Sequence, residues 1–367
     1  MDLSLDDTAT SCDSLRTRYK RAVTDLLRSL KSDPKLNYSS NDLMELNVNL
    51  GMFNPEDPDF VASHVCLFKP IPSDEFEKFT FDLSKASRDT RGSHDEYDKR
   101  YFEISEDVTE GRCQPDREEV FAMSQDAERT AQYLNIRYEY SRAKTSRFKT
   151  LAIISGWTQM DIENSFSKLP EGFLSGFQRC QQIPDWDIRA DYEWQDKKTI
   201  YPHVMLVMRS GAVAVEGKLF LGELGSIAQV IKNRLAQKEF VTTSLFPVLV
   251  IALYGPRNGR LIQARYDKSG VLKVRASPIY SFAEREKAPW DLFLRYHTSK
   301  QCDGPEIELG YDQVESEYVP IETESCRGID VLAREPKHVP KNGLEPHQAN
   351  KENIPPGNDE EWQADEQ

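Results

Sequence analysis

The strongest constraint on the fold of this chain is an uninterrupted apolar run, "FPVLVIALYG", at residues 246–255. A strand at the surface alternates apolar and polar side chains, whereas a short and wholly apolar run is typical of a strand that is covered on both faces. The sequence therefore predicts that this run is a central strand of a sheet.

The segments around this run indicate more strands and one helix. "DWDIRADYEWQ" (185–195) alternates apolar and polar side chains over ten residues, which is typical of a strand. "LGSIAQVIKNRLAQKEF" (224–240) has apolar residues at helical spacing. "RLIQARYD" and "VLKVRAS" read as two strands joined at Lys268-Ser269-Gly270, a hairpin signal. Together they favour an α/β or α+β sheet domain over about residues 150–300.

Two helices are predicted in the N-terminal part. "SLRTRYKRAVTDLLRSLKS" (14–32) has apolar residues at helical spacing. The segment 116–144 begins after a proline with acidic residues in its first turn and has basic ones near its end, as the helix dipole favours. Between them, residues 86–112 look like a long polar loop.

The C-terminal part differs in composition. Residues 301–367 contain 17 acidic and 5 basic residues and almost no aromatics, so we expect them to be disordered. The expected division is an N-terminal helical and loop-rich extension (1–114), a sheet domain (115–300) and an acidic disordered tail (301–367).

Charge and cysteine usage exclude several classes of protein. No apolar run is long enough to cross a membrane, and the acidic N-terminus lacks the apolar core of a secretory signal. The six cysteines are scattered, which argues against a zinc site or a disulfide framework and fits a reducing intracellular compartment. The net charge is −14, but residues 141–300 hold 24 Lys and Arg against 15 Asp and Glu. Such a basic centre fits a polyanion-binding core, although chance clustering beside acidic tails explains it almost as well.

The stretch "PHVMLVMRSGAVAVEGK" (202–218) contains the candidate chemistry. Two strands, roughly 203–208 and 212–218, would form a hairpin closed at Ser210 and Gly211. With a two-residue loop, His203 faces Lys218, and His203, Glu216 and Lys218 share one face; a three-residue loop turns His203 away.

With the helix and the buried strand that follow, this stretch resembles the core of the PD-(D/E)XK nuclease superfamily. The family's usual pattern is Pro-Asp, a strand, a tight turn, a strand ending in (Asp/Glu)-x-Lys, and a helix that often carries a Gln. Glu216-Gly217-Lys218 matches its second half and Gln229 lies where the helical Gln would. The match covers about residues 185–255. The resemblance implies a mixed central sheet of the restriction-endonuclease-like αβββαβ type with N-terminal helices packed on it.

The resemblance also implies a function, hydrolysis of nucleic acid phosphodiesters with Mg²⁺ or Mn²⁺. Glu216 and His203 would be metal ligands, and Lys218 and Gln229 would complete the catalytic set. His203 stands in place of the family's aspartate, and a neutral imidazole is a poor ligand for Mg²⁺. Asp185, Asp191, Glu193 and Asp196 are possible substitutes for the missing carboxylate.

The alternative is a catalytically inactive nuclease fold that acts as an interaction or scaffold module. Glu216 and Lys218 would then be a solvated pair on an ordinary strand, which contributes little to stability, and His203 a packed side chain at a strand end.

Nucleic acid, DNA or RNA, is the expected partner, and the nucleus is the expected compartment ahead of the cytoplasm. The candidate phosphate-binding residues are Lys232, Arg234, Arg257 and Arg260. In the tail, Lys351-Glu352-Asn353 resembles the KEN-box degron that the mitotic ubiquitin ligase reads, so recognition by that ligase is a second expectation.

Overall fold

The computed structural model describes residues 5–302, except 64, 100–103, 110–112, 114, 147, 161–171, 177–184 and 197–198. The predictions of a disordered tail and of a KEN motif lie outside the described residues.

The helices are α1 (Leu5–Ser32), α2 (Ser40–Glu45), α3 (Pro58–Ala62), α4 (Ser73–Phe76), α5 (Arg88–Asp95), α6 (Glu106–Thr109), α7 (Arg117–Tyr140), α8 (Leu151–Ile154), α9 (Leu221–Ala236) and α10 (Trp290–His297), with a 3-10 turn at Lys238–Phe240. The strands are β1 (Asn37–Tyr38), β2 (Val48–Met52), β3 (Phe68–Lys69), β4 (Phe79–Phe81), β5 (Ser141–Ala143), β6 (Trp157–Gln159), β7 (Trp186–Asp196), β8 (Thr199–Val213), β9 (Leu219–Phe220), β10 (Val248–Gly255), β11 (Asn258–Tyr266), β12 (Leu272–Ala276), β13 (Tyr280–Ser281) and β14 (Lys300–Gln301).

A mixed sheet forms the centre of the fold, in the order β2-β12-β11-β10-β8-β7-β6, with β13 paired to β11. β10 runs parallel to β8, and β2 runs parallel to β12, whereas the other neighbours on this path are antiparallel. All eight residues of β10 are buried, so the prediction of a central strand is confirmed. The predicted mixed α/β class with N-terminal helices is also confirmed.

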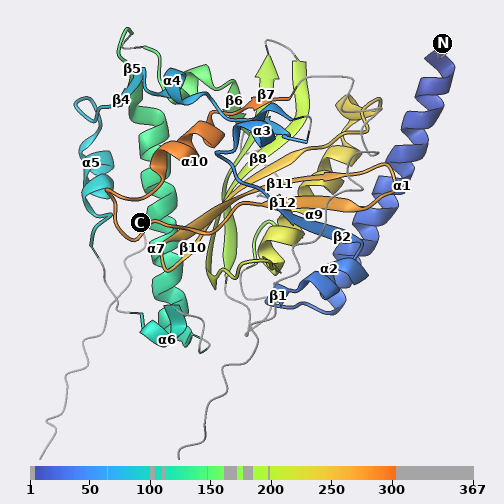
Figure 1. The fold of residues 1–367 in the computed structure, drawn as a ribbon, viewed down its shortest axis with the longest axis horizontal. Helices are drawn as coiled ribbons and strands as arrows, with labels where there is room; N and C mark the ends of the chain where they lie inside the picture. Colours follow the sequence, from blue (N-terminus) through green and yellow to red (C-terminus); the bar gives the residue numbers. More distant parts are fainter. Residues whose placement is uncertain are drawn as a thin grey trace, which may run out of the picture. The chain divides into compact units, whose positions relative to one another are not determined.

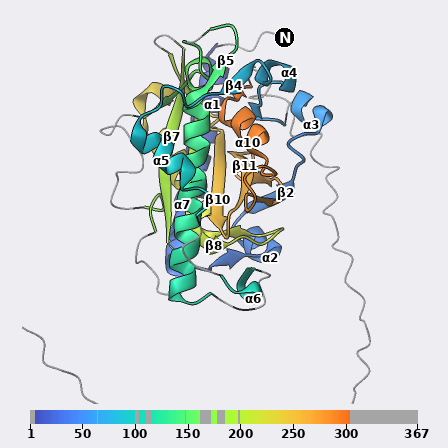
Figure 2. The same ribbon diagram turned by 90° about the vertical axis from the view of Figure 1, so that its left-hand side faces the viewer.

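Helices cover both faces of this sheet (Figure 1). On one side α9 lies against the sheet and α1 packs on α9; this side is called the back face. On the other side α7 crosses β8 and β10, and Figure 2 shows α7 running along the sheet in the foreground; this side, which α10 also covers, is called the front face.

The two faces have different cores. Leu206 and Met208 of β8 lie in the back-face cluster, together with the aliphatic residues of α1 and α9. Met205 and Val207 of the same strand lie in the front-face cluster, which is rich in Tyr, Phe and Trp. This is the alternation that a strand imposes on its neighbours.

Local sequence explains where the two covering helices begin. Asp116 caps α7: its carboxylate accepts hydrogen bonds from the backbone N–H groups of Glu118 and Glu119, at 2.8 and 2.9 Å. In α9, the Glu223 carboxylate accepts from the Phe220 N–H at 3.0 Å. Both helices were predicted from sequence, as was α1.

The prediction of a polar loop at 86–112 is wrong in part. Two short helices, α5 and α6, lie within it. Ser87 caps α5 by accepting a hydrogen bond from the Thr90 N–H at 3.0 Å, and Tyr97 just beyond α5 is fully buried. A Ser N-cap and one buried tyrosine thus order a segment that has little apolar periodicity.

No helix among the described residues combines the length and the hydrophobicity needed to cross a membrane.

Candidate functional site

The predicted hairpin at Ser210 and Gly211 is wrong. β8 continues through both residues to Val213, and it pairs with β7 on one side and β10 on the other. Gly211 is needed for close approach: a Cβ atom there would lie 2.7 Å from the Val120 carbonyl oxygen of α7. Its N–H donates to the Asp185 carbonyl at 3.2 Å, as a strand residue would. The hairpin is instead formed by β7 and β8, where Asp196 pairs with Thr199.

This correction separates His203 from Glu216. His203 lies near the start of β8 and Glu216 lies beyond its end. Ten residues of strand separate His203 from Val213, which corresponds to roughly 33 Å. His203, Glu216 and Lys218 therefore do not share a face.

His203 is a buried core residue. It is 5% exposed and packs edge-on against Phe68, with 5.5 Å between the ring centroids. Burial, assisted by the nearby Arg234 charge, lowers its pKa to about 3. Its Nδ1 atom has no hydrogen-bond partner among the described residues. The side chain is therefore neutral and enclosed at physiological pH.

Glu216 and Lys218 lie in an exposed turn between β8 and β9. Gly217 between them has φ +71°, a conformation that glycine adopts readily. The Glu216 carboxylate accepts a hydrogen bond from the Ile279 N–H at 2.7 Å, and the Lys218 carbonyl accepts one from Arg260 at 2.9 Å. The turn is fastened to its surroundings by these two contacts.

The residues do not fit the magnesium or manganese site that the family implies. Within the part of the chain that the structure describes, no three His, Cys, Asp or Glu side chains gather as a metal site would require. Of the possible substitute carboxylates, Asp191 is buried and Glu193 pairs with Arg234 at 3.2 Å. Among the described residues, Glu216 is thus not part of a cluster of ligands that could hold a hard cation.

Gln229 is a packed residue of α9. It is 8% exposed and donates from Nε2 to the Asn233 side chain at 2.9 Å. Gly172 lies against it, since a Cβ at Gly172 would lie 2.7 Å from Gln229 Oε1. Gln229 lies more than two helical turns into α9, which itself begins after Lys218.

Of the four predicted phosphate-binding residues, only Lys232 is exposed. Arg234, Arg257 and Arg260 are each no more than 2% exposed. Arg234 pairs with Glu193 and Arg257 with Asp126, at 3.2 and 3.3 Å, and Arg260 donates to Glu223 at 2.8 Å. These three guanidinium groups therefore connect internal elements and offer no surface to a phosphate backbone.

A groove that the sequence did not indicate lies between α7 and the β6–β7 edge of the sheet, and is called the α7–β7 groove. It encloses about 150 Å³. Its floor is largely apolar and its rim is polar. The floor residues are Ala131, Leu134, Ala190, Tyr192, Val207 and His297, and the rim residues are Glu128, Gln132, Asn135, Gln159 and Arg189.

His297 is the most unusual residue of this groove. It is 1% exposed and stacks on Tyr138, with 3.8 Å between ring centroids and 10° between the planes. Neither ring nitrogen has a hydrogen-bond partner among the described residues. Burial lowers its pKa to about 3, so the ring is neutral, with one ring nitrogen a donor and the other an acceptor.

A charged cluster adjoins the groove at Glu128. The Glu128 carboxylate forms ion pairs with Arg189, at 2.7 Å, and with Arg209, at 2.9 Å. Arg209 donates a hydrogen bond to the Ser124 hydroxyl at 2.8 Å. Asp187 completes the cluster, at 3.5 Å from Arg189 and 3.9 Å from Arg209.

The acidity of Asp187 is perturbed in this cluster. Burial raises its pKa, and the neighbouring Arg209 and Arg189 oppose that rise only in part. A carboxyl group with a raised pKa beside a cleft is a feature of functional sites, although structural ion pairs produce it too.

The sequence contained one signal for this site. In the strand 186–196 the polar residues Asp187 and Arg189 are separated by one residue, a spacing that places both on one face of a regular strand. A register shift between Ile188 and Ala190 breaks that alternation. As a result Trp186 and Ile188 belong to the back-face core, whereas Tyr192 belongs to the front-face core at the groove.

No family model matches this chain, and neither a curated protein nor a solved structure matches it.

Proposed function

We propose that this chain is a catalytically inactive nuclease-like module that binds single-stranded nucleic acid, with one base seated in the α7–β7 groove. The observation that supports this proposal is the composition of that groove: an apolar floor with neutral aromatic rings under a rim of amide and guanidinium groups and the Glu128 carboxylate. Stacking on rings and hydrogen bonds from amides and arginine are the means by which proteins take up unpaired bases.

The element order supports this reading. Helix α7, strands β6, β7 and β8, helix α9 and strand β10 follow one another in the order that the nuclease resemblance implies, with short elements between them. The donor set at Glu216 does not suit Mg²⁺, so we favour binding over hydrolysis. A nuclear location would follow from such binding and remains a prediction.

Each rim residue has a role in this proposal. Arg189 has a side chain that is 42% exposed and would contact the phosphate next to the seated base. Gln132 and Gln159, both exposed, would read the edge of that base. His297 would present one ring nitrogen from below.

The test is fluorescence anisotropy with a labelled 12-nucleotide single strand and the matching duplex, at several salt concentrations. We expect the single strand to bind more tightly, and Arg189→Ala to weaken it about tenfold, the effect of one good polar contact. Lys232→Ala is the matched control, because it removes an exposed cation from α9 on the back face and should change little.

The same samples distinguish binding from catalysis. We expect no cleavage with Mg²⁺ or Mn²⁺. Cleavage that disappears in Glu216→Ala would reject the proposal in favour of a hydrolase. Binding that is unchanged in Arg189→Ala would also reject the proposal.

A second candidate function is protein interaction. Two large apolar side chains close in sequence, Phe148 and Ile153, are 86% and 67% exposed. An interaction module would use such side chains. Absence of nucleic acid binding even at low salt would favour this candidate.

A further inference from the structure

Two cysteines that are far apart in the sequence meet where β14 pairs with β3. The two strands run antiparallel, with Gln301 opposite Phe68. One step further along, the Cys302 N–H donates to the Leu67 carbonyl at 3.4 Å. Cys66 and Cys302 therefore lie on neighbouring segments, although their positions in the sequence differ by 236.

The side chains of these two cysteines are in contact. The Cys302 thiol donates a hydrogen bond to the Cys66 carbonyl. A hydrogen bond with the Cys302 side chain, assisted by the Lys69 charge, lowers the pKa of the Cys66 thiol, although burial opposes this. The Cys66 sulfur thus has thiolate character, and the Cys302 side chain lies beside it.

The pairing that holds Cys302 in place is short and weak. β14 has only two residues, and Lys300 is directly opposite Lys69, both of them exposed. Like charges in such positions weaken the pairing of two strands. Cys66 is fully buried whereas Cys302 is 8% exposed, so local opening of β14 admits a small reactant to Cys302 first.

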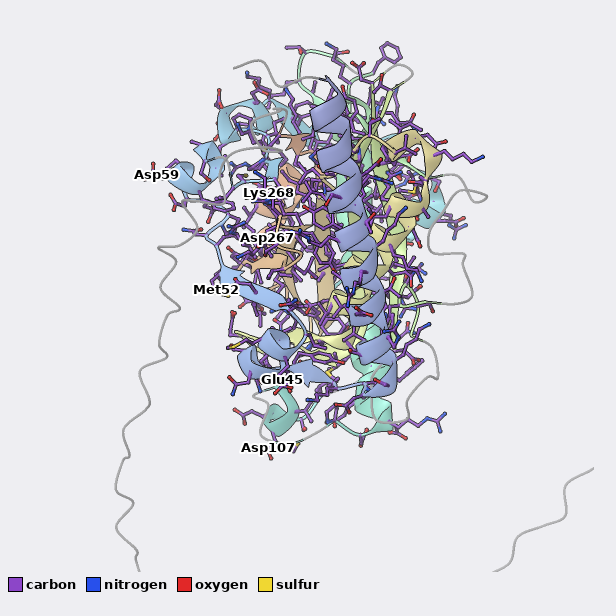
Figure 3. The ribbon with its side chains drawn as sticks, turned by 90° about the vertical axis from the view of Figure 1, so that its right-hand side faces the viewer. Glu45, Met52, Asp59, Asp107, Asp267 and Lys268 are labelled. Atoms are coloured by element: carbon purple, nitrogen blue, oxygen red, sulfur yellow. The ribbon has the colours of Figure 1, made fainter. Side chains whose placement is uncertain are left out.

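The surroundings of the pair are held more firmly. Trp157 Nε1 donates to the Ser299 carbonyl at 2.7 Å, and the Ser299 N–H donates to the Tyr296 carbonyl at 3.0 Å. Opening is therefore confined to residues 300–302. The other partner follows α3, and Figure 3 shows Asp59 of α3 to one side of α1.

We propose that Cys66 and Cys302 are a redox pair that hydrogen peroxide converts to a reversible disulfide, which fixes β14 on β3. The Cys302 thiolate attacks one peroxide oxygen, the O–O bond breaks, and hydroxide leaves a sulfenic acid on Cys302. The Cys66 thiolate then attacks the Cys302 sulfur, and the S–O bond breaks as the S–S bond forms. Each hydroxide takes up the proton that one thiol has released. Two thiols and one peroxide thus give one disulfide and two water molecules.

This bond differs from a disulfide framework. Two equivalents of a small thiol such as glutathione reverse it by exchange and are themselves oxidised to the disulfide. In a reducing compartment such bonds are transient and respond to oxidants. The proposal does not depend on the α7–β7 groove.

The test adds about one equivalent of hydrogen peroxide to the reduced full chain, blocks the remaining thiols, and digests the denatured protein with a protease that cuts before aspartate. Cys66 is then in peptide 59–73 and Cys302 in peptide 291–302, and each peptide contains a single cysteine. We expect the two peptides to be joined, with a mass lower by two hydrogen atoms than their sum. Dithiothreitol should separate them.

The variants assign the order of the two steps. In Cys66→Ser the sulfenic acid of Cys302 has no neighbouring thiolate to capture it, so its labelling by dimedone should rise at least about tenfold over the wild type. A cysteine with a packing role alone would show no such rise. Cys113→Ser replaces an exposed cysteine and is the matched control, which should leave the joined peptides unchanged.

Two outcomes would overturn the proposal. One is the absence of the joined peptides after Cys113 has been oxidised. The other is a disulfide from Cys302 to any other cysteine or to a second copy of the chain.

Cleavage by trypsin after Lys300 measures the effect of the bond on β14. Oxidation should slow this cleavage at least about fivefold in the wild type, because a closed strand does not enter a protease site. It should have no effect in Cys66→Ser. Equal cleavage of the oxidised and the reduced wild type would contradict the claim that the disulfide fixes β14.

Discussion

The two faces of the sheet bury charge in different ways. On the back face the Arg260–Glu223 pair is sealed: Arg260 is 1% and Glu223 0% exposed, and the Tyr254 hydroxyl also donates to Glu223 at 3.3 Å. On the front face Glu128 keeps 14% of its side chain exposed and is shared by Arg189 and Arg209, which are 42% and 14% exposed. Because the Arg260–Glu223 pair is inaccessible to solvent, it can affect only the stability of the fold. The partly exposed Glu128 cluster can also form hydrogen bonds with a ligand.

Acid should produce the largest effect, and it should act through two histidines that lie against front-face residues. The pKa of His203 and of His297 is lowered to about 3 in the folded protein, from about 6.5 when unfolded. The unfolded state therefore binds more protons than the folded state below pH 6.5. The free energy of unfolding has its full value above that pH and falls as the pH decreases. At pH 4.5 the two groups should together remove about 5 kcal/mol from the free energy of unfolding.

Urea denaturation at pH 7.0 and pH 4.5 measures this loss. His203→Phe and His297→Phe should each abolish about half of it. A pH dependence that is unchanged in the double variant would contradict the assignment.

Removing one partner of the sealed pair should come next. Glu223→Ala leaves Arg260 buried and uncompensated, so we expect a loss of about 3–5 kcal/mol in the free energy of unfolding. The matched front-face change, Glu128→Ala, should cost about 1 kcal/mol, because Asp187 and water remain available to both arginines. Equal losses from the two variants would show that the faces do not differ.

Gly211 tests the contact between the front-face helix and β8. Gly211→Ala should cost about 1–3 kcal/mol, since the added methyl group meets the Val120 carbonyl. Gly92→Ala in α5 is the control: nothing lies within 4 Å of its added Cβ, so it should stabilise by about 0.5–1 kcal/mol. If Gly211→Ala leaves the free energy of unfolding unchanged, α7 must lie farther from β8 than described.

The smallest expected effect has the opposite sign. His297→Phe removes two unpartnered nitrogens and keeps the ring stacked on Tyr138, so stability at pH 7 should rise by about 1 kcal/mol. The same variant should weaken oligonucleotide binding. A gain in stability together with a loss of oligonucleotide binding would show that His297 serves ligand binding at a cost in stability. A loss of stability would show that its ring nitrogens have hydrogen-bond partners.

Much of the fold could be predicted from the sequence. The apolar run at β10, the helical spacing in α1, α7 and α9, and the hairpin at Lys268-Ser269-Gly270 all correspond to observed elements. Gly270 has φ +87°, as a turn residue often does. In each case one local pattern determines one element, which is why these predictions are correct.

The candidate site could not be predicted, because the same residue type serves two purposes. Ser-Gly is a turn signal, and in Gly270 the missing side chain does permit a turn. At Gly211 the missing side chain allows α7 to approach through Val120, 91 residues earlier in the chain, a contact that no local sequence pattern indicates. The arginines were misleading for the same reason, since their carboxylate partners Asp126, Glu193 and Glu223 are distant in the sequence.

The parallel pairing of β2 with β12 has a consequence for how the chain is made. Val48 lies beside Leu272, so the N-terminal strand of the sheet must wait for a partner that is synthesised 224 residues later. At about 5–20 residues per second, that interval is roughly 10–45 s on the ribosome. We therefore expect β2 to join the sheet last, after the ribosome has delivered β12, and the segment that carries it to be the part of the nascent chain most exposed to chaperones.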